Sequence, residues 1–137
     1  MLHIHHSINL FALLTCAVFV WILGAVWYSP VLFAKPWSAI IGRPLGEKPK
    51  GVVLGMVSSL IGDFLLALVM DHFILWSHAS TFGFGCLIGF ICWIGFVLGP
   101  LFPQHVYEGR PRTYFLINGG YWLIGMMVTG GILAIWR

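Results

Sequence analysis

The sequence predicts an all-α integral membrane protein in which four transmembrane helices form a compact bundle. Of its 137 residues, 60% are hydrophobic and 8% are charged, whereas soluble domains contain about 45–50% apolar and about 25% charged residues. A membrane-spanning helix needs about 20 apolar residues, and the chain contains several runs of this length. No room remains for a further soluble domain, so we expect residues 1–137 to form a single transmembrane domain.

The apolar runs define the expected spans in chain order. They cover residues 8–33, 51–73, 82–102 and 114–135. After the first span, a basic and Pro-rich connection begins with residues 33–41, which we expect to form a short helix along the membrane interface. The third span is expected to end beside Pro100 and Pro103, because prolines are common where membrane helices end.

Basic residues predict the orientation of the chain. Lys35, Arg43, Lys48 and Lys50 lie in the first connection, Arg110 and Arg112 lie in the third, and Arg137 alone lies at the opposite side. Because positive residues are retained in the cytoplasm, we expect a multi-pass membrane protein with both termini outside. The net charge of +3 indicates contact with anionic membrane lipids and is too small and scattered for nucleic-acid binding.

Small residues recur at helical spacing on the second and third spans. They are Gly51, Gly55, Ser58, Ser59 and Gly62 on one, and Gly85, Gly89, Cys92, Gly95 and Gly99 on the other. In lipid, close approach through small residues is the main source of helix packing energy. We expect the two faces to pack against each other; the alternative is an interface in a homo-oligomer or with another membrane protein.

Asp63 is the one acidic residue well inside an apolar run, ~18 Å from the cytoplasmic start of its helix. An ionised carboxylate there costs at least ~2.5–3.5 kcal/mol, and no Lys or Arg lies at that depth. One interpretation is a proton or cation site. The other is a protonated Asp63 that locks the bundle through a hydrogen bond to Ser59, Thr15 or a backbone carbonyl.

Two further polar groups are expected near the cytoplasmic interface. Asn118 lies at the level of Tyr28 and close to Tyr121, which predicts interhelical hydrogen bonds. Arg110 and Arg112 are expected to be solvated in their loop; the alternatives are binding of a lipid phosphate or pairing with Glu108.

The outer side collects His3, His5, His6, Asp71, His72 and His78. Imidazoles with a carboxylate are a ligand set for zinc, copper or nickel, but this spacing fits no named metal site. We therefore expect no cofactor, and these residues are only weak candidates for an exterior metal ion.

Two motifs resemble a known family. Residues 25–33 read AVWYSPVLF, and residues 107–111 and 115–121 read YEGRP and FLINGGY. They are similar to the bacterial membrane proteins of the family of unknown function DUF1761, and the notable positions are Trp27, Tyr28, Ser29, Pro30, Glu108 and Arg110. The resemblance implies a small four-helix protein of the bacterial inner (plasma) membrane and brings no activity or catalytic residue.

No catalytic motif is present: the chain has no G-x-S-x-G, no H-E-x-x-H and no phosphate-binding glycine loop. We expect a small non-enzymatic accessory or assembly subunit that acts through small-residue helix packing. The alternative is an oligomeric small transporter or channel in which Asp63 is the proton or cation site. A cavity with other polar side chains around Asp63 would favour transport, and a dry, hydrogen-bonded Asp63 would favour the accessory role.

Overall fold

The computed structural model describes residues 8–136, and this part of the chain is helical without strands. The helices are α1 (Leu10–Trp27), α2 (Ala34–Ile41), α3 (Val52–Trp76), α4 (Phe82–Trp93), the π-helical turn η1 (Ile94–Leu98), α5 (Gly99–Glu108) and α6 (Arg112–Ile135). Since α4, η1 and α5 are continuous, residues 8–136 contain four helices that are long and apolar enough to cross a membrane. The predicted all-α fold with four spans is confirmed.

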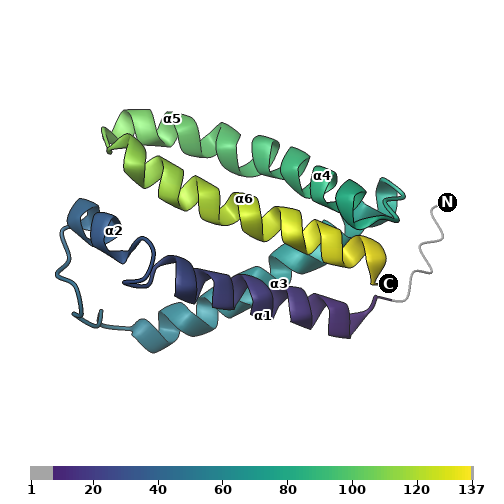
Figure 1. Ribbon diagram of the computed structural model, residues 1–137, viewed down its shortest axis with the longest axis horizontal. Coiled ribbons are helices and arrows are strands. Elements are labelled where there is room, and N and C mark those ends of the chain that lie inside the picture. The colour runs from purple at the N-terminus through teal and green to yellow at the C-terminus, as the bar shows by residue number, and fades with distance from the viewer. Residues whose placement is uncertain (1–7, 137) are drawn as a thin grey trace.

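The four long helices pack as two pairs, and α6 lies on the side of its own pair that faces the other pair (Figure 1). One pair consists of α1 and α3, which cross each other; the other consists of α6 and the α4–η1–α5 helix, which run side by side. α6 also contacts α1 and α3, whereas α3 touches α4 at only a few positions. The start of α1 and the end of α6 lie at the same end of the bundle, and α2 lies at the other (Figure 1).

Local signals explain the ends of the first two helices. The side chain of Asn9 accepts a hydrogen bond from the Ala12 N–H and caps α1. α1 ends at Trp27, earlier than predicted, and a turn leads into α2. The short helix expected within residues 33–41 is present as α2, and it ends at Gly42, whose φ of 70° lies in the left-handed region that glycine adopts without strain.

The predicted end of the third long helix beside Pro100 and Pro103 is wrong, because the helix continues through both prolines to Glu108. The π-helical turn η1 lies just before Pro100, and the Gly99 N–H reaches back five residues to the Ile94 carbonyl. Pro103 has no N–H to contribute and lies inside α5. Proline alone was therefore a poor indicator of this helix end.

The π-helical turn also rotates the packed face of this helix. Gly85, Gly89 and Cys92 are buried, and the half-buried side chains that follow include Val97 in η1 and Leu101 in α5, five and nine residues beyond Cys92. The extra residue in the π turn breaks the α-helical spacing of the small residues. Gly95 and Gly99, which the sequence pattern placed on the packed face, are therefore exposed.

The small residues of α4 pack against α6 rather than α3. A Cβ atom at Gly85 would overlap the Gly130 carbonyl oxygen, and one at Gly89 would overlap the Met126 carbonyl oxygen. On α3, a Cβ atom at Gly55 or Gly62 would have no neighbouring atom of the described chain within 4 Å. The expected pairing of the two small-residue faces is thus not formed, because α3 crosses α1 and residues 52–62 stay exposed.

Candidate functional site

Asp63 lines a cavity of about 500 Å³ between α1, the first half of α3 and the middle of α6, hereafter the Asp63 cavity. Its lining residues are Trp21, Gly24, Ala25, Tyr28, Met56, Ser59, Gly62, Asp63, Tyr121 and Trp122. The structure thus brings together Asp63, Ser59 and Tyr121, which the sequence predicted as an intramembrane polar site, and adds Tyr28.

The Asp63 side chain is buried, and the structure shows no hydrogen bond between its carboxyl group and the described residues. The residue is 2% exposed, and its Oδ2 atom has no partner among residues 8–136. The two hydroxyls proposed as partners are occupied within their own helices. Thr15 donates to the Phe11 carbonyl at 2.8 Å, and Ser59 donates to the Met56 carbonyl at 3.0 Å.

No Lys, Arg or His is among the described residues that line this cavity. An isolated polar group in a medium of low dielectric is costly. A bound proton or a positively charged partner would therefore stabilise the Asp63 carboxyl group in this cavity.

Aromatic side chains form much of the cavity wall, and three of them use their polar atoms elsewhere. The Tyr28 hydroxyl donates to Asn118 Oδ1 at 2.6 Å, the Tyr121 hydroxyl to the Val20 carbonyl at 3.2 Å, and the Trp21 indole to the Met56 carbonyl at 3.0 Å. The Tyr28 and Tyr121 rings meet edge to face with centroids 5.7 Å apart. What these residues can offer a ligand is chiefly the aromatic ring.

Trp21 and Trp122 were not predicted as site residues. Trp21, Gly24 and Tyr28 are spaced at i, i+3 and i+7, so they share one face of the first helix and its end. This spacing could have indicated that Trp21 lies on the same side of the helix as Tyr28. Trp122 follows Tyr121 directly, and no periodicity linked it to Asp63.

Asn118 takes part indirectly. It holds Tyr28, and it lines a neighbouring cavity of about 350 Å³ together with Gln104 and Trp122. The carbonyl of Ile117, the residue before Asn118, accepts a hydrogen bond of 2.9 Å from the Trp27 indole. Two of the segments that carry the family resemblance, residues 25–33 and 115–121, are therefore hydrogen-bonded to each other.

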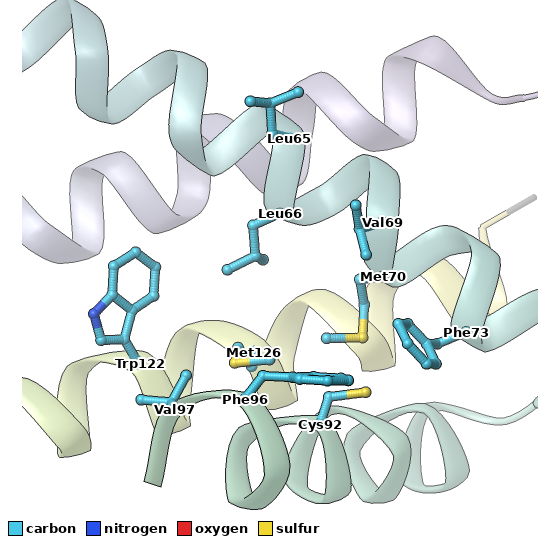
Figure 2. Close-up of a pocket in the computed structure, with 10 residues that line it drawn as sticks. All are labelled: Leu65, Leu66, Val69, Met70, Phe73, Cys92, Phe96, Val97, Trp122 and Met126. Atoms are coloured by element: carbon cyan, nitrogen blue, oxygen red, sulfur yellow. The ribbon is translucent and has the colours of Figure 1, made fainter. Parts of the chain in front are cut away.

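An apolar cavity of about 420 Å³ lies between α3, α4–η1 and α6 (Figure 2). It is lined by Leu65, Leu66, Val69, Met70, Phe73, Cys92, Phe96, Val97, Trp122 and Met126. Leu65, Val69 and Phe96 are 54%, 55% and 64% exposed, so the cavity has an opening on the bundle surface. Trp122 lines both this cavity and the Asp63 cavity.

The remaining predicted polar residues have structural contacts. Arg110 pairs with Glu108 at 2.7 Å and lies 4.6 Å from the Tyr114 ring centroid, which matches the ion-pair alternative. The pair is exposed and contributes little to stability. Ser29 bonds back to the Val26 carbonyl, and the adjacent Pro30 lies in the turn after α1.

The candidate metal ligands are dispersed where the structure describes them. Asp71 is buried, His72 Nδ1 lies 2.8 Å from the Leu68 carbonyl, and His78 is exposed. Within residues 8–136 no three His, Cys, Asp or Glu side chains gather as a metal site. His3, His5 and His6 lie outside the described residues.

The four long apolar helices and the intramembrane carboxyl group define the class: an α-helical, multi-pass membrane protein. The chain belongs to the family described as "Protein of unknown function (DUF1761)", whose model matches residues 11–134. The predicted family is therefore confirmed. No curated protein and no solved structure matches the chain.

Proposed function

We propose that this protein is a small membrane transporter in which Asp63 binds the transported proton or cation. The observation that carries the proposal is the buried Asp63 carboxyl group, which lacks a hydrogen-bond partner in the described chain and lines a cavity of about 500 Å³. A carboxyl group that only locked helices together would be bonded to one of them. This one is available to a proton or a cation instead.

The shape of the bundle supports an oligomer as the transporting unit. The Asp63 cavity is bounded by three helices of one chain, and Ser59 and Gly62 on its wall are exposed. Residues 52–62, at the start of α3, are likewise exposed. A second copy that covers this face would enclose the cavity and shield it from lipid.

The orientation follows from the basic residues. The connections that carry Lys35, Arg43, Arg110 and Arg112 lie at the end of the bundle where α1 ends and α3 begins. In an inner membrane with these residues in the cytoplasm, the Asp63 cavity belongs to the cytoplasmic half of the bilayer.

Proton flux into liposomes that contain the purified protein tests the proposal. We expect flux above that of protein-free liposomes, and we expect Asp63→Asn to abolish it while the protein stays folded. Asp71→Asn is the matched control, since it makes the same change on the same helix at a residue that does not line the cavity. Equal flux in the wild type and Asp63→Asn, or none above protein-free liposomes for a series of monovalent cations, would contradict the proposal.

An accessory or assembly role is the second candidate, and the exposed small residues Gly55 and Gly62 favour it. Such a face is suited to close packing against another membrane protein. Gentle purification of the native complex followed by mass spectrometry tests this role. A stoichiometric partner that is lost in Gly62→Leu supports it, and recovery of this chain alone speaks against it.

A further inference from the structure

We infer that the Asp63 cavity binds amphipathic organic cations, with the charged head beside Asp63 and the apolar substituent in the neighbouring apolar cavity. This inference rests on the proposed function, since it names the class of cation that Asp63 would bind.

The first argument is the composition of the cavity wall. Trp21, Tyr28, Tyr121 and Trp122 line the same cavity as the unpartnered Asp63 carboxyl group. Aromatic ring faces attract cations, and Trp and Tyr rings are the usual recognition elements for quaternary ammonium groups. A carboxyl group and aromatic rings together suit an ammonium head.

The second argument excludes a hard metal ion as the natural ligand. Ca²⁺ takes about 6–8 oxygen ligands and Mg²⁺ about six. Asp63 supplies the only carboxylate among the described lining residues, and the hydroxyls of Tyr28 and Tyr121 are bonded to Asn118 and Val20. A weakly hydrated organic cation needs few oxygen ligands, and the volume of about 500 Å³ is that of a small-molecule site rather than of a bare ion.

The third argument is the position of Trp122. Its indole is shared by the Asp63 cavity and the apolar cavity, so the two adjoin there. On α3, Asp63 lines the Asp63 cavity, and Leu66, three residues further along, lines the apolar cavity. The two cavities are therefore about one helical turn apart along α3. In Figure 2, the Trp122 ring stands at one end of the apolar cavity, and Leu66 and Met126 lie beside it. A molecule that fills both cavities must be charged at one end and apolar at the other.

The surface opening gives such a molecule a route from the bilayer. Val69 and Phe96, at the edge of the apolar cavity, are each more than half exposed on helices that are long and apolar enough to cross the membrane. An amphipathic cation already partitions into the bilayer, so its apolar part can enter the protein laterally.

Binding to the protein in lipid nanodiscs, measured by isothermal titration calorimetry with empty nanodiscs as the blank, tests the inference. The probes are tetramethylammonium, hexyltrimethylammonium and uncharged 1-hexanol. We expect hexyltrimethylammonium to bind at least about tenfold more tightly than tetramethylammonium, because its chain loses contact with water. 1-Hexanol should not bind measurably. Asp63→Asn should weaken hexyltrimethylammonium at least about tenfold.

Val69→Trp places an indole at the opening of the apolar cavity and should remove the advantage of the longer chain without affecting tetramethylammonium. Leu54→Trp is the matched control, because Leu54 is 74% exposed on the same helix and lines neither cavity. Equal binding of the two cations, or binding unchanged in Asp63→Asn, would overturn the inference.

The two proposals can fail separately. Proton flux that depends on Asp63 with no binding of either ammonium would overturn this inference and leave the transport function standing. Absence of both flux and binding would contradict the two together.

Discussion

The hydroxyl of Tyr28 donates a hydrogen bond of 2.6 Å to Asn118 Oδ1 and so joins the end of α1 to α6. The bond lies beside the one from Trp27 to the Ile117 carbonyl. Together they fix one wall of the Asp63 cavity, since Tyr28 lines that cavity.

Tyr28→Phe should therefore destabilise the bundle while keeping its fold. The change removes one interhelical hydrogen bond, worth about 0.6–2 kcal/mol inside a membrane. Thermal unfolding in detergent, followed by circular dichroism, would show a lower midpoint. Tyr107→Phe is the control, because Tyr107 is 90% exposed. If Tyr28→Phe and Tyr107→Phe both have the unfolding midpoint of the wild type, the bond does not stabilise the bundle.

Substitutions at glycine separate packed positions from open ones. Gly89→Leu should destabilise strongly, since even a Cβ atom there overlaps the Met126 carbonyl oxygen and α6 would have to move. Gly62→Leu should leave the melting temperature of the monomer unchanged, because no described atom lies within 4 Å of a first side-chain carbon there. The same melting temperature for both variants would contradict the packing described for α4 and α6.

Size measurements on Gly62→Leu test the oligomer. If a second copy covers the first half of α3, this variant should run as a smaller species than the wild type in size-exclusion chromatography with light scattering. An unchanged size would place the interface elsewhere or indicate a monomer.

The orientation can be checked by chemical labelling. A cysteine placed beside Arg43 should resist a membrane-impermeant thiol reagent in intact cells and react after lysis, because the basic connection is expected in the cytoplasm. A cysteine at Ser80, an exposed position in the opposite connection, should react in intact cells. The reverse pattern would invert the topology.

Hydropathy predicted the existence of the four spans, since a helix surrounded by lipid must be apolar over its whole length. Which faces meet was harder to predict. Small residues at helical spacing show that a face permits close approach, but not whether another helix is there, as Gly89 and Gly62 demonstrate. The π-helical turn escaped prediction as well, because Pro100 and Pro103 are compatible with both a helix end and a π-adjusted helix.

The residues of the Asp63 cavity were predictable only in part. Asp63 was conspicuous because a carboxyl group is expensive among apolar residues. Trp21 and Trp122 were not, because aromatic residues are common in any membrane helix and only the crossing of α1 and α3 beside α6 brings them to the carboxyl group.

Replacement of Asp63 by an apolar residue gives the sharpest contrast between a binding group and a packing group. Because its carboxyl group has no hydrogen-bond partner in the described chain, burial of this group costs about 1–3 kcal/mol. Asp63→Leu should remove this cost, because the two leucine methyl groups replace the two carboxylate oxygens beside the cavity. We therefore expect a higher melting temperature together with loss of proton or cation binding, the pattern of a residue kept for function at the expense of stability.

Ala67→Leu is the control for that experiment. Ala67 lies one turn further along α3 with no exposed surface, so a larger side chain there should lower the melting temperature by overpacking. If Asp63→Leu also melts below the wild type, the carboxyl group supports the bundle through a contact such as a buried water molecule. In that case the bundle-locking interpretation of Asp63 would replace the transport proposal.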